Sequence, residues 1–167
     1  LLAAGMSVLG ALACGVVPYI LFVKGGARGG DVKLCAALGA VLKPVIGIFD
    51  ESDDTLAFIN ARDAKALAEV GTSCPDHFVR TRIKPLYVAW DPAGGTLDTL
   101  KLAIAEGASA YRRDYTAYYE SFATADSPRL RDPNPSVVLV PGLGMFAFGP
   151  TRREARYTAE FYRNAIR

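Results

Sequence analysis

A polar stretch in the middle of the chain gathers residue types that could do chemistry. Residues 71–86 include His77, the one histidine of the sequence, with a cysteine and an acid close before it. Cations then follow at every second position, as Arg80, Arg82 and Lys84. In an extended chain a period of two places all three on one face. Such a row suits a phosphate or carboxylate, because arginine can donate two parallel hydrogen bonds to these groups. We therefore predict an anion contact at these four residues.

Other roles for these residues compete with the anion contact. A catalytic zinc site uses about three protein ligands, and this chain has one histidine and no cysteines at metal-binding spacing. A catalytic triad needs a placed nucleophile, and no serine or cysteine lies in a recognisable nucleophile turn. We predict no catalytic and no metal-ligating residue, with a local hydrogen bond for His77. For the cations, the alternative is a solvated strand face paired with the acids near Asp50.

Bulk composition divides the chain near Lys43. The 167 residues are enough for one domain, and the net charge of +2 gives no indication of nucleic-acid binding. Residues 1–42 are apolar and charge-poor, whereas residues 43–167 carry equal numbers of acidic and basic residues. The odd number of cysteines, without metal spacing, indicates a reducing compartment. We expect a soluble body over residues 43–167, located in the cytoplasm.

Residues 1–42, which we call the head of the chain, contain a predicted membrane helix. The segment that starts at Leu1 and ends at Val23 carries no charge and is long enough to cross a bilayer. A second apolar segment covers residues 32–42. We expect membrane contact through the first segment, which would place the protein in the bacterial inner membrane as the alternative location. A buried core helix is the competing interpretation.

Asp31 lies between these two apolar segments and suggests a second kind of chemistry. Its surroundings, Gly29-Gly30-Asp31, resemble the second aspartate motif of prepilin peptidases, which are membrane aspartic proteases. The family pattern is Gly-x-Gly-Asp, and Arg28 stands where the first glycine belongs. Aspartic proteolysis needs two carboxylates close together, and the head contains no second aspartate. We therefore expect an incomplete, inactive peptidase-like fragment, or simply a charged loop between two hydrophobic helices.

The body predicts a small sheet with packed helices. In order, we expect a helix over residues 53–70 with a break near Asn60, a strand over 85–90, a long helix from Thr96, strands over 136–140 and 145–148, and a last helix after Thr151. This order is typical of an α/β or α+β domain.

One apolar stripe runs along the predicted long helix. Its members step by three or four residues and are Leu97, Leu100, Ile104, Ala108, Tyr111, Tyr115, Tyr118 and Phe122. We predict that the stripe packs against the sheet. The alternative is that its tyrosine-rich half is a binding face.

Residues 45–167 resemble the middle region of bifunctional proteins that join a rhamnulose-1-phosphate aldolase to a short-chain dehydrogenase. The matching stretches occur in one order along the chain: residues 45–47, 49–52, 71–86, 111–115, 118–120, 131–135, 140–145, 160–162 and 164–166. Residues 138–149 with the last helix also resemble the closing strand, turn, strand and helix of class II aldolases. In that resemblance Leu143 stands where those enzymes carry a metal-binding histidine.

The resemblance implies a fragment of an enzyme of bacterial rhamnose catabolism. The full-length family would cleave the sugar phosphate L-rhamnulose 1-phosphate to dihydroxyacetone phosphate and L-lactaldehyde with zinc, and oxidise the aldehyde with NAD. The zinc histidines would lie upstream of this region and the dinucleotide loop downstream, so we expect no cofactor bound by this chain and no activity alone. The alternatives are a membrane-associated peptidase fragment and a non-catalytic scaffold or interaction domain. We also expect a homo-oligomer.

Overall fold

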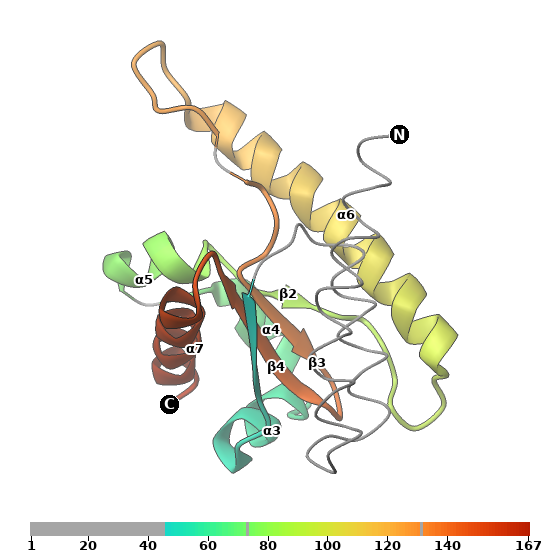
Figure 1. The fold of residues 1–167 in the computed structure, drawn as a ribbon. Helices are drawn as coiled ribbons and strands as arrows, with labels where there is room; N and C mark the ends of the chain where they lie inside the picture. The colour runs from blue at the N-terminus through green and yellow to red at the C-terminus, as the bar shows by residue number, and fades with distance from the viewer. Residues whose placement is uncertain (1–45, 73, 131) are drawn as a thin grey trace.

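The computed structural model describes residues 46–167, apart from 73 and 131. The predicted membrane segment, the second apolar segment, Asp31 and the predicted boundary near Lys43 lie outside the described residues. The elements along the chain are β1 (Ile46–Asp50), α3 (Asp53–Ile59), α4 (Ala64–Val70), α5 (Pro75–Thr81), β2 (Leu86–Tyr87), α6 (Leu97–Phe122), β3 (Val137–Val140), β4 (Gly144–Gly149) and α7 (Arg152–Ile166) (Figure 1).

Four strands form one mixed sheet in the order β1-β4-β3-β2. The central hairpin is antiparallel and pairs Val137 with Ala147 and Val140 with Gly144. On its outer sides, β1 pairs antiparallel with β4, and β2 pairs parallel with β3. Every residue of β3 and β4 is buried, as expected for short, continuously apolar strands covered on both faces. The predicted strands over 136–140 and 145–148, and the α/β class, are confirmed.

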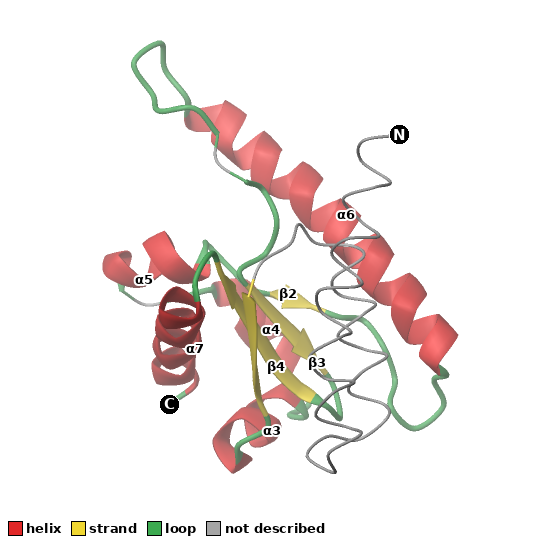
Figure 2. Cartoon of the chain, viewed as in Figure 1, coloured by secondary structure: helices red, strands yellow, loops and turns green. Residues whose placement is uncertain are grey.

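Helices cover the two faces of the sheet to different extents (Figure 2). On one face, Val138, Val140, Phe146 and Phe148 pack with the buried side of α6. On the other face, the alternate residues of β3 and β4 pack with Ile59 of α3, Ala68 of α4, and Ala159 and Tyr162 of α7, as the two-residue period of a strand requires. The domain is therefore a three-layer α/β structure with two separate cores.

A tight turn closes the central hairpin. Pro141 and Gly142 occupy its two middle positions, and Leu143 donates its backbone N–H to the carbonyl of Val140 at 3.1 Å. Gly142 has a φ of 72°, which this turn type requires after proline. The Gly142 N–H also donates to Oδ1 of Asn60 at 2.8 Å. Asn60 ends α3, so the predicted helix break at this residue is confirmed and one hydrogen bond ties it to the hairpin.

α6 begins where the sequence predicts but is only partly a core helix. Thr96 accepts a hydrogen bond from the backbone of Thr99, and the Thr99 side chain accepts one from the Thr96 N–H, which forms a capping box. The aliphatic half of the stripe is buried except for Leu97, which is partly exposed at the helix start, and burial ends at Tyr111. Tyr118 and Phe122 are exposed, so the prediction that the whole stripe packs against the sheet is wrong at its aromatic end, where the helix continues past the sheet (Figure 1).

Two further predictions are corrected by local hydrogen bonding. The predicted strand over 85–90 is shortened to β2, because the Trp90 N–H donates to the carbonyl of Val88 at 2.9 Å and turns the chain away from β3. The polar stretch after residue 74 is helical rather than extended. Its first helical residue is Pro75, whose fixed φ suits the first turn of a helix.

No helix in the described part of the chain is both long enough and apolar enough to cross a membrane.

We expect Ile104→Ala to lower the free energy of unfolding by about 2–5 kcal/mol, because it leaves a cavity in the core between α6 and the sheet. Ile104 is 1% exposed. The matched control on the same helix is Leu102→Ala, at a residue 58% exposed, which should change stability by no more than about 0.5 kcal/mol. Urea denaturation measures both, and equal losses would contradict the assignment of this helix face to the core.

Candidate functional site

His77 and Arg80 both face α7. The His77 ring stacks on Phe161, with ring centroids 4.9 Å apart and planes 17° apart. Nη1 of Arg80 lies 3.3 Å from Oε1 of Glu154 in a half-exposed ion pair. Among the described residues, Nδ1 of His77 is buried and has no hydrogen-bond partner. The local hydrogen bond expected for the His77 side chain is therefore not formed at Nδ1, and both residues serve to pack α5 on α7.

Arg82 ends α5 in a strained backbone conformation. Its φ is 67° and its ψ is −173°, a region that residues with a side chain rarely occupy. Several contacts hold it there. The Arg82 N–H donates to the carbonyl of Phe78 at 3.1 Å, and Nη2 donates to the carbonyl of Asp132 at 2.8 Å. The next residue, Ile83, brings its carbonyl so close to Gly71 that a Cβ there would lie 2.1 Å away.

The guanidinium of Arg82 also covers an aromatic ring. Its Cζ lies 5.4 Å from the centroid of Tyr115 on α6, and Nη1 donates to the Tyr115 hydroxyl at 3.4 Å. A cation over a tyrosine face is attracted by the electron density of the ring. Arg82 therefore connects the end of α5, the middle of α6 and the segment that returns from α6 to β3.

Lys84 points to a different partner again. Its ammonium forms an ion pair with Glu69 of α4, and its carbonyl accepts a hydrogen bond from the Tyr111 hydroxyl at 2.8 Å. Burial of Tyr111 raises its pKa, although nearby Arg82 lowers it, and the net shift is upward. Tyr111 thus stays protonated and keeps donating this hydrogen bond.

The predicted row of three cations on one face is not formed. Arg80 points to α7, Arg82 to α6 and Lys84 to α4. The physical reason is that α5 is helical through Thr81 and that Arg82 then reverses the chain, so a period of two never applies. A contact of these residues with an anion stays a prediction, and each cation already has a protein partner.

A pocket of about 250 Å³ lies beside Lys84, and we call it the aromatic pocket. It is lined by Glu69, Ile83, Lys84, Tyr111, Asp114, Tyr115 and Tyr118. Tyr111 and Tyr115 stack with centroids 6.3 Å apart. Its walls are mostly apolar, and within the described residues Asp114 has no ion-pair partner. This arrangement suits binding rather than proton transfer or nucleophilic attack.

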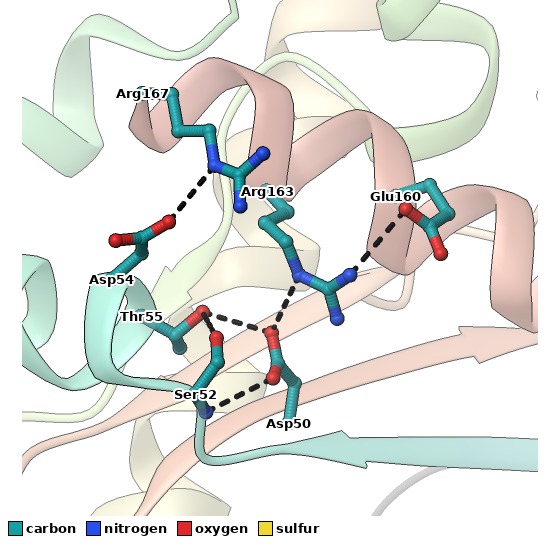
Figure 3. A network of polar contacts seen from close by, with 7 residues as sticks. All are labelled: Asp50, Ser52, Asp54, Thr55, Glu160, Arg163 and Arg167. Carbon is teal, nitrogen blue, oxygen red and sulfur yellow. Dashed lines mark hydrogen bonds and ion pairs between the residues drawn. The ribbon is translucent and has the colours of Figure 1, made fainter.

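A second polar cluster joins the two ends of the described chain (Figure 3). Asp50, at the end of β1, is 8% exposed. Its Oδ2 accepts hydrogen bonds from the Thr55 hydroxyl at 2.8 Å and from Nε of Arg163 at 3.2 Å, and its Oδ1 accepts one from the Ser52 N–H at 3.1 Å. Arg163 also contacts Glu160. The cluster fixes β1, the start of α3 and α7 relative to one another.

The hydrogen bonds of this cluster set the ionisation of Asp50. Burial alone would raise the pKa of Asp50, but the bonds from Thr55, the Ser52 N–H and Arg163 outweigh it, and the pKa lies below its ordinary value of 3.8. Asp50 is therefore a carboxylate whose charge is used for structure. The expected pairing of this acid with the cations of residues 80–84 is wrong, because Arg163 and the start of α3 occupy it.

The described residues do not fit a metal ion. Across residues 46–167, apart from 73 and 131, no three His, Cys, Asp or Glu side chains are grouped so that they could hold one. Leu143, in the place where the resemblance puts a metal histidine, is a partly buried residue packed on the core between α6 and the sheet. We assign no metal-dependent step to these residues.

A family model described as "Aldolase class II, second domain" matches residues 31–167. This chain belongs to that family. The chain is also 36% identical over 126 residues to a curated protein of Bacillus subtilis (strain 168) described as "Uncharacterized oxidoreductase YuxG". That match covers 74% of the chain but 18% of the relative. No solved structure is significantly similar to the chain.

Sequence reasoning missed the contacts that join distant parts of this second domain. The Asp50–Arg163 pair spans 113 residues, and no local pattern signals it. The aromatic pocket had a partial signal, since the tyrosine-rich half of the stripe was considered as a binding face. No pattern in the sequence indicated that Arg82 lies over the ring of Tyr115.

We expect Asp50→Asn to lower the free energy of unfolding by about 1–3 kcal/mol at neutral pH, because it weakens hydrogen bonds to a buried charge. Since the folded pKa lies below 3.8, the stabilisation is complete above that pH and is lost as the pH falls through the folded value. The difference between the wild type and the variant should therefore shrink in acid. Denaturation across pH 2–7 measures it.

Asp54→Asn is the control for this experiment. Asp54 pairs with Arg167 at 2.9 Å on the surface, and its loss should change stability by no more than about 0.5 kcal/mol. A wild-type advantage over Asp50→Asn that stays constant down to pH 2 would contradict the role given to the Asp50 carboxylate.

We expect Arg82→Gly to be more stable than Arg82→Ala by about 1 kcal/mol, because both lose the side chain and glycine alone relieves the strained backbone. Urea denaturation of the two variants compares them directly. An alanine variant at least as stable as the glycine variant would show that the conformation at Arg82 carries no strain.

Proposed function

We propose that this second domain belongs to a bifunctional enzyme of rhamnose catabolism. In this proposal a class II aldolase cleaves L-rhamnulose 1-phosphate to dihydroxyacetone phosphate and L-lactaldehyde, and an NAD-dependent dehydrogenase oxidises the aldehyde. The observation that supports this proposal is that the same chain matches both an aldolase family model and a protein described as an oxidoreductase. The family model is of an aldolase domain, whereas the relative matched over 126 residues is described as an oxidoreductase. A protein with both activities reconciles them.

The length of the relative is consistent with an enzyme that has two catalytic parts. The matched segment is 18% of the relative, so most of that protein lies outside it and has room for an aldolase centre and a dehydrogenase. The substrates, a phosphorylated sugar and NAD, are intracellular molecules, and we place the proposed enzyme in the cytoplasm.

Within this enzyme the second domain would act by positioning rather than by reacting. Its described residues do not group metal donors, and its aromatic pocket has the chemistry of a contact surface. The cations predicted to contact an anion, Arg80, Arg82 and Lys84, each have a partner within the domain. We infer that the chain alone does not turn over the sugar phosphate, and that the reacting groups come from the rest of the longer protein.

The test is a chimera in which residues 46–167 replace the matching segment of the Bacillus subtilis relative. We expect the parent and the chimera both to release dihydroxyacetone phosphate from L-rhamnulose 1-phosphate in the presence of zinc, and both to reduce NAD with L-lactaldehyde. The isolated 167-residue chain should do neither. A coupled assay for dihydroxyacetone phosphate and the absorbance of NADH measure the two reactions.

Three outcomes of this test would each contradict a different part of the proposal. A parent that oxidises aldehydes but cleaves no L-rhamnulose 1-phosphate would overturn the substrate. A chimera that keeps the oxidation but loses the cleavage of its parent would overturn the role of this domain in the aldolase. Turnover by the isolated chain would show that it holds a complete active site.

A further inference from the structure

Within the described part of the chain, the second half of α6 extends past the sheet (Figure 1). The helix has 26 residues, which is roughly 39 Å at 1.5 Å per residue. The central strands have four and six residues, which is roughly 20 Å or less at 3.3 Å per residue. Among the residues of α6, none after Tyr111 is buried. About ten residues of helix therefore lack a sheet to pack against.

The projecting half presents aromatic rings to solvent. Tyr118 is 52% exposed and Phe122 is 71% exposed, and their rings lie in contact, tilted by 51° to each other, with centroids 5.1 Å apart. Tyr118 also lines the aromatic pocket, so the exposed rings and the pocket form one continuous surface, which we call the aromatic surface. Exposed apolar groups that gather in this way mark interaction sites.

We propose that the aromatic surface docks the part of the longer aldolase protein that precedes this second domain. This inference rests on the proposed function. It is supported by the family description, which names a second domain and so implies a first one, and by the relative, of which this chain spans 18%. The aromatic surface is the part of the described domain where a partly buried pocket adjoins a pair of exposed, tilted rings.

The chemistry of the aromatic surface specifies its partner. The pocket of about 250 Å³ is mostly apolar and accepts one large apolar side chain. Asp114, at the pocket and without an ion-pair partner among the described residues, suits a lysine or arginine beside that side chain. The docking segment should therefore carry an apolar anchor next to a cation, as in interfaces with an aromatic centre and a polar rim.

Site-specific labelling tests the proposal. Phe122→Cys is introduced into the isolated chain and into the chimera described above, and its reaction with a maleimide is followed by mass spectrometry of the peptide that contains it. We expect the thiol to react roughly tenfold more slowly in the chimera, because burial hides it from the reagent. Leu102→Cys is the matched control, since it lies on the opposite side of the same helix, and its rate should be the same in both proteins.

Stability provides a second readout. The double variant Tyr118→Ser with Phe122→Ser should leave the Tm of the isolated chain unchanged, because both side chains are exposed there. In the chimera the same pair should lower the Tm by several degrees, because the polar side chains would be buried at the docking surface. Leu102→Ser should lower neither.

The outcomes separate this inference from the proposed function. An active chimera in which Phe122→Cys reacts as fast as in the isolated chain overturns the docking surface and leaves the function in place. A folded but inactive chimera with a protected thiol overturns the function and supports the docking. Protection already in the isolated chain, with a dimer by light scattering, means that a second copy covers the surface and overturns the proposal. A chimera that does not fold, beside a parent that does, also counts against it.

Discussion

The central β3–β4 hairpin is the constraint on which the rest of the domain depends. Its two strands have no exposed residue, so every side chain must enter one of the two cores. The alternation along each strand assigns neighbouring residues to opposite faces. A slip of one residue in their pairing would exchange the two cores completely. The Pro141-Gly142 turn fixes the register, and α3, α6, α7 and the two outer strands pack against a hairpin whose two sides are already defined.

The two faces of this hairpin are covered by different sets of elements. One face is covered by segments from both ends of the domain, and the Asp50–Arg163 pair holds β1 and α7 in place there. Among the described residues, the other face is covered mainly by one helix, α6. A single helix that crosses the sheet must either stop at the sheet edge or continue without support. α6 continues, and the guanidinium of Arg82 contacts the middle of the helix at Tyr115.

The sequence predicted those elements whose signals are local. The hairpin, the start of α6 at Thr96 and the break at Asn60 all follow from patterns within a few residues. It failed at α5, because polar side chains hide a short helix and alternation between Arg80 and Lys84 resembles a strand. It could not tell how far the sheet extends beneath α6, so it left open whether the aromatic half of the stripe, with Tyr118 and Phe122, packs on the sheet or forms a binding face. The sequence did not predict the hydrogen bonds of the Asp50 cluster, because the partners come from opposite ends of the domain.

The pairing of β1 with β4 has a consequence for synthesis of the chain. β1 leaves the ribosome about a hundred residues before its hydrogen-bonding partner, since Ile46 pairs with Gly149. Until β4 appears, β1 has no strand beside it, and Asp50 lacks Arg163 until α7 is nearly complete. Contacts between residues so far apart make folding slow, because a long loop must close before they form. The domain therefore becomes native only when its last helix is made, and its first strand spends the whole of that interval as an open edge.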